Sequence, residues 1–238
     1  MRKRYNLSKL VKQLTTAGAP AISVNCDAIL YDCKLDDISV AREASASAAL
    51  AASDDSDDGV ISPPILASAL ILYPYQLYKL RLAGADAATL QVAALEDKDL
   101  LYMTKIATSL QMHLFACVTS DVQIERVGKL SINNSIKALV VSNRDMETFA
   151  LDETAGEQAL KLLRGNAIKE FQAKLPDVLM FVKGGVGVVN DEKDTGSSYL
   201  QVIKEAGACG AIVGSGLAHK KEEDGGLALK ALLANLEK

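Results

Sequence analysis

The sequence has few of the side chains that bind metal ions or cross-link secreted proteins. Its 238 residues include two histidines, His113 and His219, and four cysteines. The cysteines are Cys26, Cys33, Cys117 and Cys209. They form no Cys-x-x-Cys pair and lie mostly in apolar segments. We therefore expect buried free thiols in a reducing compartment, rather than disulfides or a zinc site.

Long apolar runs and concentrated positive charge are also missing. No apolar run reaches the roughly 20 residues of a membrane-spanning helix, and no secretory signal is visible at the N-terminus. The formal net charge is −4, and only the first four residues, Met-Arg-Lys-Arg, are strongly basic. A nucleic-acid-binding surface would need a basic stripe. We therefore expect neither a membrane span nor a nucleic-acid partner.

The most informative feature present is an internal repeat. The segments "TAGAPAISV" (16–24), "LAGADAATLQV" (82–92) and "EAGACGAIVG" (205–214) each contain Ala-Gly-Ala followed by an apolar strand. Each follows a stretch with helical periodicity, and a glycine just past a helix end adopts the left-handed conformation that terminates the helix. A helix, an Ala-Gly-Ala turn and a strand that recur along one chain are typical of a (β/α) repeat.

Apolar segments that alternate with helical ones predict seven strands. They cover residues 21–26, 64–71, 87–93, 113–119, 137–143, 178–184 and 210–216. Strands that are apolar almost throughout are typical of a parallel sheet covered by helices. The sequence therefore predicts an α/β fold, a TIM (β/α)8-type barrel that forms a single domain over residues 1–238.

The strand count is one short of eight, because the chain opens with a helix at 7–14. Three explanations stay open: the barrel lacks or truncates its first strand, the strand lies upstream of residue 1, or another element fills the gap. A low-complexity Ala/Ser/Asp insertion at about 44–62 adds a second irregularity. Its alanine-rich half favours helix, and "SDDSDDG" is typical of a solvated acidic loop.

Three stretches carry a family resemblance. They are "YPYQLYKLRLAGADAATLQVAAL" (73–95), "SNRDMETFALD" (142–152) and "EAGACGAIVGSGLA" (205–218). They resemble indole-3-glycerol-phosphate synthase, a (β/α)8 barrel of tryptophan biosynthesis, and the resemblance runs from about residue 7 to the C-terminus. It implies a carboxyphenylamino-deoxyribulose phosphate as substrate, which the family cyclises, decarboxylates and dehydrates with a lysine acid and a carboxylate partner.

The positions that this resemblance matches to catalytic groups carry other residues. Ser68 in "LASAL" stands where the family's Leu-Arg-Lys-Asp-Phe has its lysine, and Cys117 stands where Val-Glu-Val-His has its glutamate. Ser142 replaces the first asparagine of Asn-Asn-Arg-Asp, and Lys183 replaces the glutamate of Ser-Glu-Ser-Gly. The glutamate, Ser-Pro-Ser and lysine of the family's first strand and loop have no counterpart. A serine without an adjacent base cannot replace an ammonium acid, so we expect these four positions to be vestigial and no residue to be catalytic.

Small residues remain where the resemblance implies a phosphate. Gly184 and Gly185 in "KGGVG", and Gly214 and Ser215 in "VGSGLA", match the loops whose backbone N–H groups hold the substrate phosphate. The alternative is that these glycines serve only turns that need a positive φ. In "SNRD", Arg144 and Asp145 either contact a ligand, or pair with each other or brace the loop.

We therefore expect a catalytically inactive barrel that acts as a structural or binding subunit of a larger assembly. A protein partner or an oligomer would cover the open barrel edge. The alternatives are an active synthase or a related phosphosugar lyase that uses unfamiliar groups, and a sensor of a phosphate-bearing small molecule. We expect no cofactor and no metal, and either a plastid or the cytoplasm as the compartment.

Overall fold

Seven parallel strands form one curved sheet in the computed structural model, which describes residues 6–28, 32–53, 61–130, 136–144, 156–186 and 197–214. The strands are β1 (Ile22–Asn25), β2 (Ile65–Ser68), β3 (Ala87–Gln91), β4 (His113–Val118), β5 (Ile136–Ser142), β6 (Leu179–Lys183) and β7 (Gly210–Ile212). They are paired in chain order, and each pair is parallel. The seven strands predicted from the apolar segments are confirmed.

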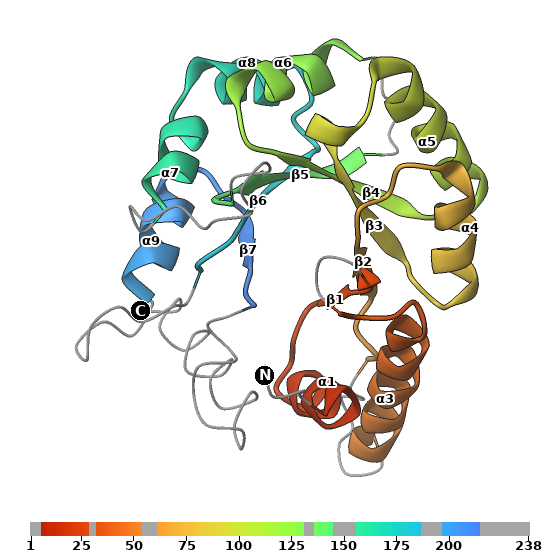
Figure 1. The fold of residues 1–238 in the computed structure, drawn as a ribbon. Helices are drawn as coiled ribbons and strands as arrows, with labels where there is room; N and C mark the ends of the chain where they lie inside the picture. The colour runs from red at the N-terminus through yellow and green to blue at the C-terminus, as the bar shows by residue number, and fades with distance from the viewer. Residues whose placement is uncertain are drawn as a thin grey trace.

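Helices surround the outer side of this sheet (Figure 1). They are α1 (Leu7–Thr16), α3 (Asp36–Ser53), α4 (Pro74–Leu82), α5 (Asp97–Ser109), α6 (Asp121–Lys129), α7 (Glu157–Leu163), α8 (Asn166–Lys174) and α9 (Ser197–Glu205), with a short 3-10 helix η1 (Val92–Ala94). Each connection from a strand through a helix to the next strand follows the parallel pattern that a (β/α) repeat requires. None of the described helices is long and apolar enough to cross a membrane.

The Ala-Gly-Ala repeat ends three of these helices in the same way. Gly18, Gly84 and Gly207 have φ angles of 83°, 103° and 96°. The alanine that follows each glycine donates its N–H to a carbonyl in the last helical turn, at 3.0 Å in all three cases. A glycine with positive φ followed by this hydrogen bond is the helix end that the sequence predicts. It directs the chain into β1, β3 and β7.

The "PYQ" motif starts helix α4. Pro74 is the first helical residue, where its missing N–H costs no hydrogen bond. The side chain of Gln76 accepts hydrogen bonds from the N–H groups of Leu72 and Tyr73, at 2.8 and 2.9 Å, and donates to the carbonyl of Leu70 at 3.0 Å. The motif therefore fixes the turn between the end of β2 and α4.

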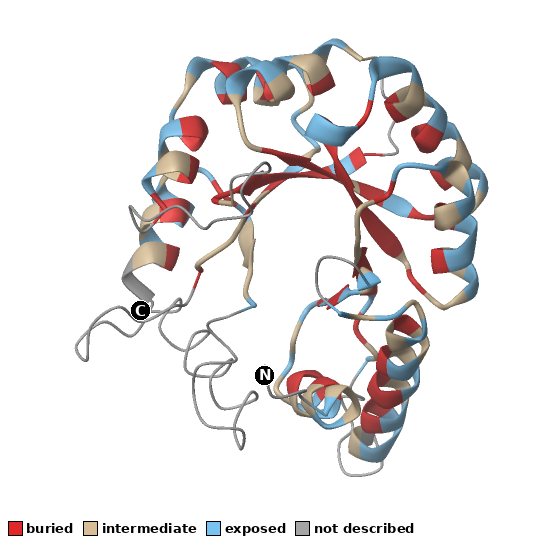
Figure 2. Ribbon diagram, viewed as in Figure 1, coloured by how far each residue is buried: buried red, intermediate tan, exposed pale blue. Residues whose placement is uncertain are grey.

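The main core lies between the sheet and the helices (Figure 2). Because strand side chains alternate between two faces, every second strand residue points to the helices. Ile65, Leu90, Leu114, Leu139 and Met180 are such residues, and each is completely buried. The residues between them point toward the barrel interior.

Strands β1 and β7 form the two ends of the sheet (Figure 1). Within the described residues, β1 pairs only with β2 and β7 only with β6. Ser23 and Asn25, which alternate with the buried Ile22 and Val24, are exposed. The sheet is thus a nearly closed barrel, and the predicted TIM-type fold is confirmed, with seven strands in the part of the chain that the structure describes.

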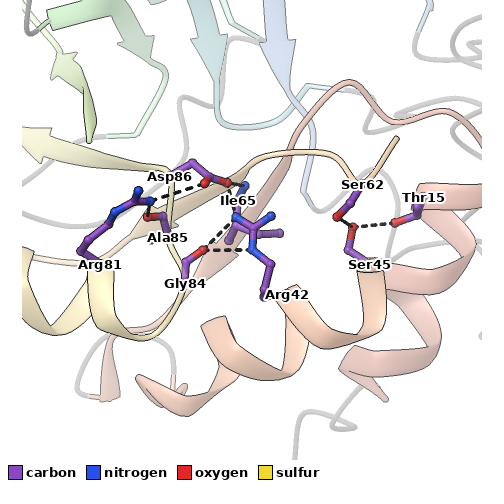
Figure 3. A network of polar contacts seen from close by, with 9 residues as sticks. All are labelled: Thr15, Arg42, Ser45, Ser62, Ile65, Arg81, Gly84, Ala85 and Asp86. Atoms are coloured by element: carbon purple, nitrogen blue, oxygen red, sulfur yellow. Dashed lines mark hydrogen bonds and ion pairs between the residues drawn. The ribbon is translucent and has the colours of Figure 1, made fainter. Parts of the chain in front are cut away.

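Helix α3 contains the first part of the low-complexity segment and packs against α1. Ala44, Ala48 and Ala49 are buried in it, as the high helix propensity of alanine favours. The hydroxyl of Ser45 lies 3.3 Å from that of Thr15 on α1 and 2.9 Å from that of Ser62 (Figure 3). Most of the predicted acidic loop, residues 54–60, lies outside the described residues.

Asp86 joins α3 and α4 to the start of the sheet (Figure 3). Its carboxylate accepts a hydrogen bond from the N–H of Ile65 at 2.8 Å and pairs with the guanidinium groups of Arg42 and Arg81. Arg42 also donates two hydrogen bonds to the carbonyl of Gly84, at 3.1 and 2.8 Å. This network lies at the N-terminal end of the strands, so it stabilises the end of the barrel opposite the candidate site.

Candidate functional site

The candidate site lies at the C-terminal ends of the strands, where parallel barrels hold their functional groups. Ser68, Cys117, Ser142 and Lys183 are at the ends of β2, β4, β5 and β6. Each alternates with a neighbour that packs in the outer core, so all four point to the inner side of the sheet. Ser142 and Lys183 are direct partners in the β5–β6 register. The structure therefore places the four sequence-predicted positions on one face and at one end of the barrel.

Three of these four side chains are uncharged. Ser142 is completely buried, and its hydroxyl accepts a hydrogen bond from the N–H of Arg144 at 3.1 Å. Cys117 is also buried, and Ser68 is half-buried. Lys183 is half-buried and is the only basic side chain in this set.

Strand β3 adds two residues that the sequence reasoning missed. Thr89 and Gln91 are buried polar residues that alternate with the core residues Ala88 and Leu90. Gln91 is the register partner of Cys117. The signal was present in the sequence, because alternation along "AATLQV" puts the threonine and the glutamine on the inner side.

Cys26, directly after β1, is a further residue at this end. Its N–H donates to the carbonyl of Ser68 at 3.0 Å, and its thiol contacts the same carbonyl at 3.7 Å. Burial raises the pKa of the Cys26 thiol from 9.0 to about 12, and the negative charge of Asp27 acts in the same direction. The thiol therefore stays protonated at neutral pH and is a poor nucleophile.

The predicted phosphate-binding glycines are only partly within the described residues. Gly184 and Gly185, directly after β6, have φ angles of 93° and 71°. This conformation strongly favours glycine, so the turn requires its glycines whether or not a phosphate binds there. Gly214, after β7, is exposed. Ser215 lies outside the described residues.

Asn143 connects four segments around the Gly184 turn. Its side-chain Nδ2 donates to the carbonyl of Gly184 at 3.0 Å and to the hydroxyl of Tyr199 at 2.9 Å. Its Oδ1 accepts from the N–H of Ala159 at 3.0 Å. Its own N–H donates to the carbonyl of Lys183 at 2.9 Å. The neighbouring Arg144 is half-buried, whereas Asp145 lies outside the described residues, so their pairing stays a prediction.

Within the described part of the chain, the cysteines form no disulfide and belong to no cluster of metal ligands. All four are free thiols, and no group of three or more His, Cys, Asp or Glu residues there could hold a metal ion. The prediction of buried thiols is correct for Cys117 and wrong for Cys209, which is exposed. Cys209 lies in the turn before β7, where the chain has left helix α9 and has not yet entered the sheet.

Comparison with known proteins identifies the family. The family model described as indole-3-glycerol phosphate synthase matches residues 1–227. The chain belongs to the indole-3-glycerol phosphate synthase family. The indole-3-glycerol phosphate synthase of Microcystis aeruginosa is 31% identical over 219 residues, which cover 92% of this chain and 62% of the relative. That of Acaryochloris marina is 29% identical over 217 residues, with coverages of 91% and 61%. The chain therefore spans a little less than two thirds of the length of these relatives.

Solved structures with the same fold are more distant in sequence. Orotidine 5'-phosphate decarboxylase from Pyrococcus horikoshii matches with a TM-score of 0.60 at 15% identity, over 99% of this chain and 97% of that one. A 3-hexulose-6-phosphate synthase matches with a TM-score of 0.59 at 17% identity, over 96% and 94% of the two chains. At such low identity the likeness shows the fold alone.

Proposed function

We propose that this chain is a catalytically inactive member of the indole-3-glycerol phosphate synthase family, which acts as a binding or structural subunit of a larger assembly. The observation that supports this most is the set of neutral side chains at the barrel mouth. Ser68, Cys117 and Ser142 occupy the inward positions at the ends of β2, β4 and β5. These are the positions that the family resemblance matches to a lysine, a glutamate and an asparagine.

The family reaction needs proton donors and acceptors close to the substrate. Ring closure, in which the carbonyl oxygen is protonated, and loss of water each require a group that gives or takes a proton near neutral pH. A serine hydroxyl has no such pKa unless a neighbouring base activates it, and no hydrogen bond among the described residues gives the Ser68 hydroxyl a base. Ser142 already accepts the N–H of Arg144. Lys183 is a cation, but β3, β4 and β5 separate its strand from β2 in the sheet.

The binding part of the proposal is a site for a phosphate-bearing small molecule at Gly184 and Gly185, to which Gly214 and Ser215, after β7 in the sequence, would contribute. The half-buried Lys183 adds a positive charge beside the Gly184 turn. A glycine-rich turn at the C-terminal end of a barrel strand allows backbone N–H groups to approach an anion closely. The glycines of this turn support the site, and Lys183, at the position that the resemblance matches to a glutamate, places a basic side chain next to them.

The structural part of the proposal rests on the ends of the sheet. The inner side of β1 is exposed at Ser23 and Asn25, and among the described residues β1 has a partner strand on one edge only. Another chain can cover such an edge. A partner protein or a second copy of this chain would fill that role. The proposal places this subunit beside tryptophan biosynthesis, in a plastid or in the cytoplasm.

An assay of the family reaction tests the proposal. The full chain is incubated with carboxyphenylamino-deoxyribulose phosphate, and the indole product is followed by its fluorescence, with the Microcystis aeruginosa enzyme as reference. We expect no signal above the protein-free background at a large excess of protein over the reference. Sedimentation of the same sample is expected to give a mass above the 25.3 kDa of one chain.

The second candidate is an active synthase or a related carbon–carbon lyase of phosphosugars. Family membership and the half-buried Lys183 at the mouth favour it. Turnover that scales with protein and disappears in Lys183→Met would establish this function and refute an inactive barrel.

A further inference from the structure

We propose that Asn143 and Tyr199 are positioning residues for the phosphate site, an inference that rests on the phosphate-binding part of the proposed function. They hold the Gly184–Gly185 turn so that the N–H of Gly185 is directed into the barrel mouth. Neither side chain contacts the anion itself. They act through the peptide that joins the two glycines.

The position of Asn143 fixes the direction of the Gly184 carbonyl. Ser142 points to the inner side of the sheet, so the next residue, Asn143, lies on the outer side. Its Oδ1 there accepts the N–H of Ala159 in helix α7. Asn143 is 2% exposed, and its Nδ2 donates to the carbonyl of Gly184. That carbonyl is therefore held toward the outer side of the sheet.

The same bond sets the direction of the Gly185 N–H. In a planar trans peptide the C=O and the following N–H point in opposite directions, and no described peptide bond is cis. The N–H of Gly185 consequently points away from Asn143, toward the mouth and the side of Lys183. No hydrogen bond within the described part of the chain uses this N–H. A donor held in this way beside a cation suits a phosphate monoester.

Tyr199 fixes Asn143 in turn. Its hydroxyl accepts from Nδ2 of Asn143 at 2.9 Å and donates to the carbonyl of Gly156 at 3.2 Å. With Ala159 on Oδ1, both N–H donors of the Asn143 amide and its oxygen have protein partners. The amide therefore has one favourable orientation, and the Gly184 carbonyl has one favourable direction. The tyrosine comes from helix α9, so the docking of that helix also controls the turn.

Phosphate titration of ¹⁵N-labelled full-length protein tests this inference, with inorganic phosphate as the probe and sodium chloride at matched ionic strength. The readouts are the amide signal of Gly185 and the dissociation constant for phosphate. The variants are Tyr199→Phe, which keeps the ring, and Asn143→Asp, which keeps the shape but removes both amide donors. Tyr102→Phe, on the exposed side of α5, is the matched control. Circular dichroism checks that each variant is folded.

We expect saturable binding in the natural protein and in Tyr102→Phe. Tyr199→Phe should weaken phosphate binding by about three- to tenfold, the effect of one lost hydrogen bond, and should shift the Gly185 signal without phosphate. Asn143→Asp should weaken binding further. A merely structural role would lower thermal stability and leave the affinity unchanged. Folded variants that bind phosphate as tightly as the natural protein would refute the positioning role alone. No binding by the natural protein would refute the phosphate site together with this inference.

Discussion

The hydroxyl of Tyr199 lies 2.9 Å from Nδ2 of Asn143, and this hydrogen bond ties helix α9 to the end of strand β5 across 56 residues of sequence. The same hydroxyl donates to the carbonyl of Gly156, the residue that precedes helix α7. Three segments therefore meet at one phenol beside the barrel mouth. A side chain added at Gly156 would collide with Tyr199, so substitution of this glycine tests how tightly the two residues pack.

Gly156→Ala should destabilise the protein because a methyl group does not fit there. Gly156 has a φ of 96°, and an added Cβ would lie 2.3 Å from the Tyr199 ring and hydroxyl. Gly207 has the same φ with nothing within 4 Å, so Gly207→Ala measures the cost of the backbone conformation alone. We expect about 1 kcal/mol for Gly207→Ala and about 1–3 kcal/mol more for Gly156→Ala, because of overpacking. Urea denaturation checks this, and equal losses for the two variants would show that Tyr199 does not fill this space.

Asp86→Ala should destabilise the N-terminal end of the barrel. The substitution leaves the N–H of the completely buried Ile65 without its acceptor and removes the partner of Arg42. We expect a loss of about 1–3 kcal/mol in the free energy of unfolding. The control is Asp97→Ala, which removes an ion pair between Arg126 and a carboxylate that is 60% exposed, and it should cost less than about 1 kcal/mol. A loss in the free energy of unfolding for Asp97→Ala as large as that for Asp86→Ala would contradict the stabilising role of Asp86.

The raised pKa of Cys26 predicts a loss of stability at alkaline pH. Burial, and then the charge of Asp27, raise that pKa to about 12 in the folded protein. Between about pH 9 and pH 12 the unfolded chain releases this proton while the folded chain keeps it, so the free energy of unfolding falls as pH rises. Below pH 9 the thiol is protonated in both states and adds no pH dependence. The difference in the free energy of unfolding between the natural protein and Cys26→Ser should therefore be constant up to about pH 8.5 and change above pH 9. A difference that stays constant to pH 11 would contradict the raised pKa of a buried Cys26 thiol.

Alkylation should distinguish the cysteines by exposure and pKa. Cys209 is exposed, whereas Cys117 is buried and Cys26 is both half-buried and held protonated. We expect iodoacetamide at pH 8 to modify Cys209 first in the native protein, and Cys26 at least about a hundredfold more slowly, because the thiolate is the reactive form. Peptide mass spectrometry over time gives the rates. As a control, unfolding in urea should make all four cysteines react. Rapid modification of Cys117 in the native protein would show that the barrel mouth is more open than the structure indicates.

The regular part of the fold could be predicted from the sequence because it is encoded locally. The Ala-Gly-Ala turns end their helices within six residues of sequence, and apolar segments mark each strand. The resemblance to the family's motifs selected Ser68, Cys117, Ser142 and Lys183, and alternation along the observed strands shows why the four lie on the inner side of the sheet. The same rule would have found Gln91.

The contacts of Asn143 could not be predicted in this way. Its partners Ala159 and Tyr199 are 16 and 56 residues away, and hydrogen bonds over such distances depend on how the helices dock on the sheet. Cys26 is a similar case, because its raised pKa comes from burial at the end of β1 rather than from a motif. Cys209 was predicted to be buried from its apolar neighbours, but a turn residue before a short end strand has no layer to cover it.

The measurement that tests the central claim most directly is ³¹P NMR of carboxyphenylamino-deoxyribulose phosphate mixed with a stoichiometric amount of the full chain, because one sample reports both binding and conversion. The account predicts that the substrate phosphate signal shifts or broadens as protein is added, while its integral stays constant over hours and no product signal appears. The Microcystis aeruginosa enzyme, added at the end, should then convert the same substrate. A product signal that grows in proportion to this protein before that addition, and that is lost in Lys183→Met, would contradict the account and establish an active barrel.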